Sequence, residues 1–503
     1  MKKILVNDNP WESRVAVIRN GTLQNIFFES RVVAVLERSF FKGHVIKVLP
    51  GIQTAFVDIG QTKAGFLHIS EIDRELAIEK MGAILGLDED EHDKKKSPRS
   101  YRPNISKILR EGDPILVQVS KEPVYEKGAK LTTCFTLPGR FIVLMPNIPR
   151  IGVSKRIESR EERIKLKTLL GQLLPSGMGA IIRTSAENRS QKEIAKDVSF
   201  LVHTWNSIQT RYKKASLKEL IYQDLDLSFQ VVRDHLDDDV ESVVVDNKDL
   251  QKRLYKFAKG IAPEQAMKVK LYEEKQNLFD RFDLESQIEE ALNKKVSLKS
   301  GGSIIIETTE AMTVVDVNTG RYTGASNLEE TVLKTNLEAA EEIVRQLKLR
   351  NIGGLIVIDF IDMATATNRQ KLFRFLEKTL REQDKYQSVV LKVSEFGVVQ
   401  MTRKRSGKTL IQQLTDTCEI CSGLGFIKSV QTESFSILRK LGQDFIKRKI
   451  IKAIISVNPH VFEFISSIEY NSIMELEKLY NCSITLRYSD ELSIGEYIIS
   501  QSK

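Results

Sequence analysis

Residues 313–363 constrain the fold most strongly, because they read as a strand, a helix and a strand in succession. The apolar runs 312–318 and 355–362 are short and rich in β-branched residues, which is typical of strands buried on both faces. A capping box at Ser326 and Glu329 begins the helix between them, and residues 351–354 end it. The pattern predicts a right-handed βαβ unit with parallel strands.

Polar side chains stand at the carboxyl ends of both strands. Asp316 and Asp359 each close an apolar run, and Asn318 follows Asp316 by two residues. Parallel strands bring their carboxyl ends to one sheet edge, where α/β proteins place their sites. Two carboxylates there suit Mg²⁺, which takes one or two protein carboxylates and completes its shell with water and phosphate. The alternative is that both aspartates cap the loops that follow them.

Composition narrows the class of protein. The chain has 503 residues, enough for several domains, and a net charge of +9, which favours a polyanionic partner. Four cysteines are too few for a disulfide framework, which indicates a reducing compartment. The N-terminus lacks the apolar stretch of a signal peptide, and no run approaches the length of a spanning helix. We therefore expect a soluble, cytoplasmic protein.

The first part of the chain predicts strands. Residues 1–37 read as three strands, and residues 38–137 alternate short strands with Gly-bearing turns. Five such strands suggest a small closed barrel of the OB type. A charged stretch at residues 82–107 interrupts this pattern and reads as a solvated insertion.

Aromatic and basic residues of this predicted barrel suggest nucleic-acid binding. Phe56 and Phe66 lie near loops, with Lys63, Lys121 and Lys127 around them. Aromatic side chains among cations form a stacking platform for single-stranded nucleic acid. The alternative is that both phenylalanines belong to the barrel core.

Residues 137–226 form a third unit of strands and charged helices. Arg183 and Thr184 follow a strand at 177–182 and precede a helix that begins near Gln191. An arginine beside backbone amides at a strand end can bind phosphate, although a surface arginine is the ordinary interpretation. A strand is expected next at residues 227–232.

Two motifs near the end of the chain also carry chemistry. Residues 402–405 place Arg403, Lys404 and Arg405 together, close to the predicted metal edge, where they would neutralise an RNA backbone. The alternative is a solvated loop. The nearby 406–409 run is not a P-loop, because Thr402 stands where that motif requires glycine.

Cys418 and Cys421 form a C-x-x-C pair followed by glycines, which resembles half of a tetrahedral zinc site. Cys134 and Cys482 stand apart and make no second pair. The same half-site of a second chain would complete the zinc site and join a homodimer. A thioredoxin-like redox pair is the alternative, but the motif does not open a helix after a strand.

Taken together, these segments resemble the ribonuclease E/G family of endoribonucleases. The matching residues are 54–60, 65–67, 143–147, 181–184, 315–318, 335–340, 353–363 and 401–405. The resemblance covers essentially the whole chain, and we expect the family's catalytic half without the long scaffold tail. Glu419 departs from the family pattern, which often has proline after the first cysteine of the zinc-link.

The resemblance implies an α/β multidomain architecture. An RNase H-like subdomain would be split by an inserted S1 (OB-type) barrel and a 5′-sensor, and a DNase I-like α/β subdomain, a zinc-link and a small α/β dimerisation domain would follow. The implied bounds are 1–37 and 229–295 for the RNase H-like parts, 38–137 for the S1 domain, 138–228 for the sensor, 296–412 for the DNase I-like subdomain, 413–427 for the zinc-link and 428–503 for the last domain.

The resemblance also implies residue roles. Asp316 and Asp359 would hold a catalytic Mg²⁺ with support from Asn318, and Cys418 and Cys421 would hold a zinc shared between two chains. Phe56, Phe66 and Lys127 match RNA-binding positions. Arg183 and Thr184, with the backbone near Val143, would read a 5′-monophosphate.

The expected activity is Mg²⁺-dependent cleavage of single-stranded, A/U-rich RNA, stimulated by 5′-monophosphate ends, in rRNA maturation and mRNA decay. We expect a homodimer, with a homotetramer as a further assembly. Two rival interpretations remain: a non-catalytic S1-type RNA-binding protein, and a metal-dependent DNA nuclease on the same sheet.

Overall fold

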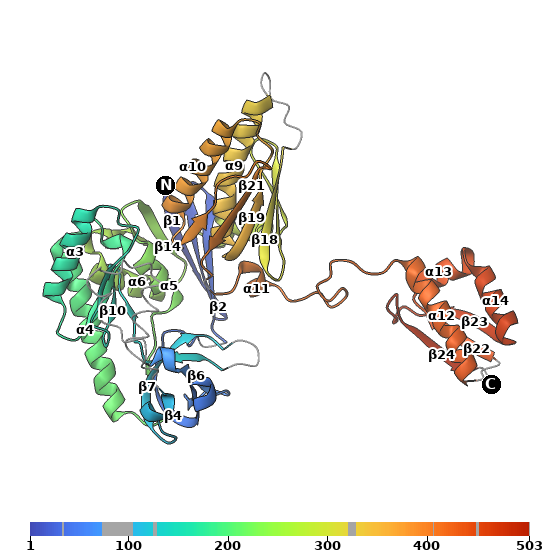
Figure 1. Cartoon of the computed structure of the whole chain (residues 1–503), viewed down its shortest axis with the longest axis horizontal. Coiled ribbons are helices and arrows are strands. Elements are labelled where there is room, and N and C mark those ends of the chain that lie inside the picture. Colours follow the sequence, from blue (N-terminus) through green and yellow to red (C-terminus); the bar gives the residue numbers. More distant parts are fainter. Residues whose placement is uncertain are drawn as a thin grey trace. The chain divides into compact units, whose positions relative to one another are not determined.

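The computed structural model in Figure 1 describes residues 1–32, 35–72, 104–123, 128–319, 328–405, 407–448 and 452–501. The chain divides into two units, Met1–Leu410 and Ile411–Lys503. Four of the sheets found in the described residues lie in the first unit, and the fifth lies in the second. The expected insertion at 82–107 and Lys127 fall largely or wholly outside the described residues.

The predicted βαβ unit is present. Strand β18 (Met312–Asn318) leads through helix α9 (Leu328–Leu349) to strand β19 (Gly354–Asp359), and the two strands pair in parallel. Asn351 adopts a left-handed backbone with φ 51°, a conformation that asparagine tolerates, and the helix has ended by there. Ser326 of the expected capping box lies outside the described residues.

Four further strands extend this pair into a six-stranded mixed sheet. Its order is β16-β17-β18-β19-β21-β20. Every neighbouring pair except β18 and β19 is antiparallel. The added elements are β16 (Lys295–Ser297), β17 (Ser303–Thr308), β20 (Ser388–Val390), β21 (Val398–Arg403) and the helix α10 (Ala366–Gln383).

Only one face of this sheet is deeply buried, which corrects the expectation of strands buried on both faces. Burial alternates along β18 and β19: Val315 and Ile356 are buried, whereas Val314 and Leu355 are more exposed. The buried residues share one core with α9 and α10, which lie on the same side of the strands (Figure 1). Because both helices cover one face, the other face stays open, as antiparallel and mixed sheets allow.

A five-stranded sheet combines the start of the chain with a segment more than 200 residues later. Its order is β15-β14-β1-β2-β3, and β1 pairs with β14 in parallel. The strands are β1 (Lys2–Asp8), β2 (Glu12–Arg19), β3 (Thr22–Ser30), β14 (Val240–Val245) and β15 (Val269–Leu271). The three strands predicted in residues 1–37 are therefore confirmed.

The strand predicted at 227–232 is wrong: these residues open helix α5 (Leu227–His235). Phe229, Val232 and Leu236 recur at helical spacing and pack into the core of the five-stranded sheet. A short apolar run does not reveal by periodicity alone whether it forms a strand or a buried helix. Tertiary packing decided the outcome here.

The predicted barrel is present as a closed ring of five strands. They follow the order β4-β5-β6-β8-β7, and β4 pairs with β7 to close the ring, while β13 joins β4 from outside. The strands are β4 (Phe40–Leu49), β5 (Thr54–Asp58), β6 (Gly65–His68), β7 (Pro114–Lys121), β8 (Lys130–Thr132) and β13 (Leu220–Tyr222). Figure 1 shows β4, β6 and β7 together.

The third predicted unit is a four-stranded sheet covered by two helices. The order is β11-β12-β10-β9. Its elements are β9 (Leu137–Pro138), β10 (Ile142–Met145), β11 (Ile151–Val153), β12 (Gly179–Ile182), α3 (Arg160–Leu173) and α4 (Gln191–Lys214). Ser190 is the N-cap residue of helix α4 and forms a complete capping box with Glu193.

The second unit is a small α/β domain with strand order β23-β22-β24. Its elements are α12 (Val430–Arg448), β22 (Lys452–Val457), α13 (Pro459–Ser467), α14 (Tyr470–Tyr480), β23 (Ser483–Tyr488) and β24 (Tyr497–Gln501). The other helices are α2 (Ile105–Ile108), α6 (Lys248–Ile261), α7 (Leu278–Arg281), α8 (Leu284–Glu290) and α11 (Leu410–Leu414). Within the described parts of the chain, every helix falls short of what crossing a bilayer requires.

Candidate active site

The two predicted catalytic aspartates lie directly opposite each other. Asp316 on β18 pairs with Asp359 on β19 in the parallel register. Both alternate with buried residues, so both lie on the open face of the sheet, opposite α9 and α10. Asn318 donates a hydrogen bond from its amide Nδ2 to Oδ2 of Asp316 at 2.7 Å. The structure therefore brings all three predicted residues together.

The electrostatics of this site favour a bound cation. Burial raises the pKa of Asp359, and the neighbouring carboxylates of Asp316 and Asp362 raise it further. A divalent ion between the carboxylates would remove their repulsion, and two carboxylates on one face fit the ligand set of Mg²⁺. Among the described residues no group of three His, Cys, Asp or Glu side chains forms a complete metal cage. Water and phosphate would have to supply the remaining ligands.

A buried amide fixes the backbone just beyond Asp359. Asn336 on α9 is fully buried; its Nδ2 donates to the carbonyl oxygen of Ile361 at 2.8 Å, and its Oδ1 accepts from the Ile361 N–H at 3.1 Å. The helix of the βαβ unit thus positions the segment that carries Asp359 and Asp362. Sequence reasoning quoted residues 335–340 only as a family motif and assigned Asn336 no role.

Glu329 secures the next turn of the same loop. Its carboxylate accepts hydrogen bonds from the N–H groups of Ala364 and Thr365 and from the amide of Asn368, and these bonds lower its pKa. Sequence reasoning expected Glu329 to cap its own helix. Its bonds to Ala364, Thr365 and Asn368 cap the start of α10, and the expected capping box with Ser326 lies outside the described residues.

Arg403 does not belong to the metal edge, which corrects the prediction for residues 402–405. On β21 Val398 pairs with Asp359, whereas Arg403 pairs with Gly354 at the other end of β19. Five residues of strand separate the two ends, roughly 16 Å. Arg403 is 2% exposed, and its guanidinium bonds both carboxylate oxygens of Asp384, at 2.6 and 3.0 Å. Because it is buried and paired, it cannot bind an RNA backbone in this structure.

Lys404 and Arg405 follow the end of β21 and are exposed. They share the distal position of Arg403, away from the aspartate pair. The predicted position beside the metal edge is therefore wrong for this basic run, and an RNA contact by Lys404 and Arg405 stays a prediction.

The barrel places Phe56 and Phe66 side by side. They pair across β5 and β6, and both are half-buried while their neighbours Ala55 and Leu67 are buried in the barrel core. The two rings therefore lie on the outer surface, and the core interpretation is not supported. Lys127, the third predicted RNA contact, lies outside the described residues.

Two lysines that sequence reasoning missed flank this aromatic pair. Lys47 on β4 pairs with Phe56, and Lys130 on β8 pairs with Phe66. Lys47 is exposed, whereas Lys130 forms an ion pair with Glu71 at 2.6 Å. The sequence signal was the strand alternation around Phe56 and Phe66, but only the register identifies which lysines face them.

The residues of the predicted phosphate pocket lie on or just after the neighbouring strands β10 and β12. Arg183 follows β12, and its Nη1 donates to the carbonyl of Gly139 and to Asp234, both at 2.7 Å. Thr184 is exposed and lies 3.3 Å from Ser154 through their hydroxyl oxygens. Val143 lies on the adjacent strand β10, where it pairs with Ile181. Sequence reasoning missed Asp234, which is distant in sequence.

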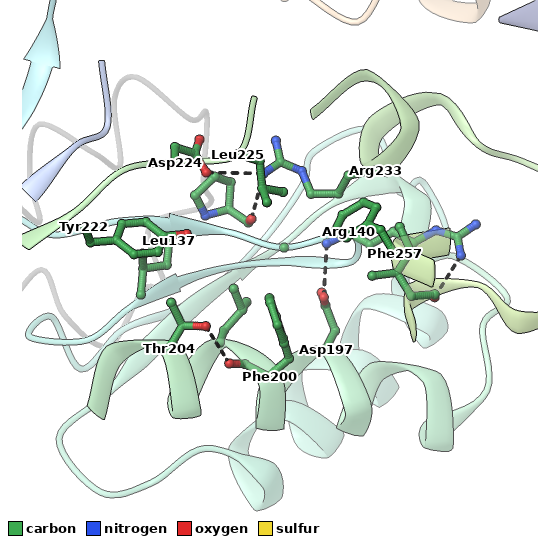
Figure 2. Close-up of a pocket in the computed structure, with 14 residues that line it drawn as sticks. Leu137, Arg140, Asp197, Phe200, Thr204, Tyr222, Asp224, Leu225, Arg233 and Phe257 are labelled. Carbon is green, nitrogen blue, oxygen red and sulfur yellow. Dashed lines mark hydrogen bonds and ion pairs between the residues drawn. The ribbon is translucent and has the colours of Figure 1, made fainter. Parts of the chain in front are cut away.

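A small pocket lies behind this region, between β9, α4 and residues of the five-stranded-sheet core (Figure 2). Figure 2 shows Asp197 accepting from the N–H of Arg140 at 3.1 Å and Arg233 beside Asp224 at 4.0 Å. Arg233 also donates to the carbonyl of Pro138 at 3.0 Å. The charges that line this pocket already have partners, so we interpret it as a structural junction.

The C-x-x-C pair lies between α11 and α12 and not at the start of a helix. Cys418 is exposed and Cys421 is half-buried. Hydrogen bonds from the backbone N–H groups of Gly425 and Gly423 lower the pKa of Cys421, and the Gly425 contact measures 3.4 Å. A stabilised thiolate with N–H donors is consistent with half of a zinc-link.

The fold and the site define a multidomain α/β protein with a closed five-stranded barrel and a carboxylate pair suited to a divalent cation. Residues 136–406 match the Ribonuclease E/G family, and residues 417–502 match the thioredoxin-like domain of RNase E/G. The chain belongs to the ribonuclease E/G family and is an endoribonuclease of that family.

Relatives match along most of the chain. Ribonuclease G of Escherichia coli strain K12 is 39% identical over 475 residues, which cover 94% of each protein. Ribonuclease G of Haemophilus influenzae is 38% identical over 472 residues, covering 94% of this chain and 93% of the relative. Ribonuclease E of Haemophilus influenzae is 34% identical over 506 residues, 99% of this chain and 52% of that protein.

Proposed function

We propose that this chain cleaves single-stranded, A/U-rich RNA by Mg²⁺-dependent hydrolysis, with stimulation by a 5′-monophosphate. The observation that carries this proposal is the direct pairing of Asp316 with Asp359, supported by the Asn318 bond to Asp316. Ribosomal RNA maturation and messenger decay are the proposed roles, and the cytoplasm is the proposed location.

Asp316 and Asp359 would hold the Mg²⁺. A bound Mg²⁺ would polarise the scissile phosphate and lower the pKa of the attacking water. Asn318 donates a hydrogen bond to one carboxylate oxygen of Asp316, and the other oxygen would be available to the ion. Asn336 holds the backbone after Asp359, so the two carboxylates keep their spacing while RNA binds.

The barrel would hold the RNA strand. Phe56 and Phe66 present adjacent aromatic surfaces to two bases, and Lys47 lies beside them to neutralise the backbone. This arrangement recognises single strands, because paired bases do not expose their faces. Lys127 remains a proposed contact.

The Arg183 pocket would read the 5′ end. Asp234 and the Gly139 carbonyl both engage Nη1 and so orient the guanidinium, and its remaining N–H groups would bind the phosphate. Thr184 and the backbone near Val143 would complete the pocket. A 5′-monophosphate offers more charge to this pocket than a hydroxyl, so it would be bound more tightly.

Cys418 and Cys421 would hold a structural Zn²⁺ together with the same pair from a second chain. Tetrahedral zinc needs four ligands, and this pair supplies two. The proposed assembly is therefore a homodimer, with a homotetramer as a higher state.

The test is cleavage of one single-stranded RNA that carries either a 5′-monophosphate or a 5′-hydroxyl, in Mg²⁺ and in chelator, with wild type and Asp316→Asn. We expect faster cleavage of the monophosphate form, and loss of cleavage in chelator and in Asp316→Asn while the variant stays folded. Cleavage by Asp316→Asn at the wild-type rate would refute the metal assignment. Equal rates on both 5′ ends would remove the sensor, and comparable cutting of a single-stranded DNA competitor would favour the DNA nuclease.

A further inference from the structure

Phe396 is an exposed aromatic side chain beside the candidate active site. It is 81% exposed and lies in the turn that precedes β21. This turn ends at Gly397. Phenylalanine is usually buried, because leaving its ring in water forgoes hydrophobic stabilisation. An exposed ring beside a reaction centre therefore requires an explanation.

The turn that carries Phe396 is rigidly built. The carbonyl of Ser394 accepts from the N–H of Gly397 at 3.3 Å, and the N–H of Ser394 donates to the carbonyl of Val398 at 2.9 Å. The Ser394 hydroxyl also accepts from the N–H of Val398 at 3.1 Å. Gly397 has φ +74°, and an added Cβ would collide with the carbonyl oxygen of Phe360. Only glycine fits this position, so the backbone after Phe396 has one conformation.

This turn adjoins the carboxylate pair directly. Val398 pairs with Asp359, and the N–H of Phe360 donates to the carbonyl of Gly397 at 3.3 Å. A Cβ on Gly397 would also lie 3.3 Å from Oδ1 of Asp362. The ring of Phe396 is thus attached one residue before Gly397, which contacts Phe360 and adjoins Asp362, the residues that follow Asp359.

We propose that Phe396 stacks on a base of single-stranded RNA next to the scissile phosphate. Every base has a π-face, so a fixed aromatic ring binds bases with little regard to sequence, as on single-strand binding proteins. A base held on Phe396 would align its phosphate with Asp316 and Asp359. This inference rests on the proposed function and adds a binding residue at the site of cleavage, separate from the barrel platform.

Steady-state kinetics test the proposal with Phe396→Ala and Phe396→Trp on an RNA with a single cleavage site. Because one stacked base contributes substantially to binding, Phe396→Ala should raise KM roughly 10-fold and change kcat by less than about 3-fold. Phe396→Trp should restore KM. Val389→Ala, at an exposed apolar residue that pairs with Thr402 at the far end of the sheet, should leave both constants unchanged.

Abasic substitution of the RNA tests stacking directly, because a purely structural role of Phe396 would not change the KM penalty of a missing base. An abasic nucleotide at each position around the cleavage site should raise the wild-type KM at one position by roughly 10-fold. In Phe396→Ala that same abasic substitution should have no further effect, because the stacking partner is already missing.

The outcomes separate the two proposals. Absence of cleavage by the wild type would refute the proposed function itself. Normal cleavage by the wild type with unchanged KM in Phe396→Ala, or equal abasic penalties in both proteins, would overturn the stacking assignment alone. A change in sedimentation of Phe396→Ala with unchanged kinetics would also overturn it and would assign the ring to a protein contact.

Discussion

Charged residues of the sheet that carries the candidate active site lie in two opposite environments. Asp359 is exposed on the open face beside other carboxylates, whereas Arg403 is buried beside the carboxylate that neutralises it. Asp359 is therefore a destabilising charge in the metal-free protein, and Arg403 is a structural one. Each assignment gives a measurable stability effect.

Asp359→Asn should stabilise the metal-free protein while it abolishes cleavage. The folded-state pKa of Asp359 is raised, so its ionised form costs stability above that pKa, and the cost disappears as the pH falls below the unfolded value. At pH 7 without metal we expect a melting temperature about 1–2 °C higher than wild type. Differential scanning fluorimetry across pH checks this, and Mg²⁺ should stabilise wild type only. A lower melting temperature at pH 7 would contradict the repulsion.

Arg403→Ala should lower the free energy of unfolding, because it leaves the carboxylate of Asp384 buried without its arginine partner. Breaking a buried ion pair costs about 3–5 kcal/mol. Urea denaturation measures the loss, with Lys404→Ala as the exposed control, whose effect should stay within about 0.5 kcal/mol. Equal stability of the two variants would argue that Arg403 is not structural.

The sequence could place Asp316, Asp359 and Asn318 because their strand-end pattern is local. It could not place Arg403. The basic run 402–405 was interpreted as one unit, whereas β21 extends through Arg403 and turns it to the buried face, toward an aspartate 19 residues away. The composition of the run does not reveal that its first cation belongs to a strand and that the other two do not.

Among elements, helix α9 does more than connect two strands. Its buried Asn336 holds the loop after β19, so the helix sets the spacing of the carboxylates. Its buried Gln346 bonds Glu342 and Arg350 in the second half of the helix, apart from that loop. Asn336 thus contacts the loop that carries the site, whereas Gln346 makes its bonds within the helix.

Asn336→Ala should lower kcat roughly 10- to 100-fold, because small displacements of catalytic groups are costly. It should also lower the free energy of unfolding by about 1–3 kcal/mol, since two backbone groups lose their partner. Gln346→Ala should cost similar stability and leave kcat close to wild type. Cleavage kinetics and urea denaturation distinguish the two, and an equal kcat loss in both variants would refute a specific role for Asn336.

The barrel surface gives an electrostatic prediction. Lys47 pairs with Phe56 and is exposed, so Lys47→Ala should weaken RNA binding and reduce the slope of log affinity against log salt by about 0.7. Fluorescence anisotropy with labelled single-stranded RNA measures this slope. Lys270→Ala, on the exposed side of β15, is the matched control. An unchanged slope for Lys47→Ala would show that Lys47 does not contact the RNA backbone.

Element types followed from sequence where helical periodicity ran long, as in α9 and α4. Helix α5 did not, because its apolar residues fit a strand as well as a helix until the five-stranded sheet is present. Lys47 and Lys130 were missed for a related reason: the register that aligns them with the phenylalanines joins strands distant in the chain.

For the whole molecule, the resemblance to a known family supplied what local patterns could not, namely that separate segments form one enzyme. The split sheet illustrates this, since no property of residues 1–30 indicates that their partner strand lies at 240–245. The fold of one chain does not determine how several chains assemble. The proposed zinc-linked dimer can be tested at the cysteine pair.

Cys418→Ser should remove the bound zinc and convert the dimer to a monomer. With two ligands from each chain, the wild type should contain about one zinc per two chains. Light scattering after size exclusion gives the mass, and elemental analysis gives the zinc. Cys482→Ser, at a half-buried thiol that bonds the Leu476 carbonyl, is the control and should keep both. A Cys418→Ser dimer would show that other contacts hold the chains together.

The split sheet also has a consequence for biosynthesis. Strand β1 leaves the ribosome long before its partner β14. The bond between Asn7 and Asp246, the residue that follows β14, joins positions 239 residues apart. At typical rates of synthesis the ribosome needs roughly 10–50 s to deliver that partner. The barrel and the four-stranded sheet are complete by then, while the core residues Ile4 and Val6 still await the rest of their cluster. Strand β1 therefore waits for its partner while the two units between them can already fold, so a nascent chain of this protein needs protection at β1 for longer than at either of them.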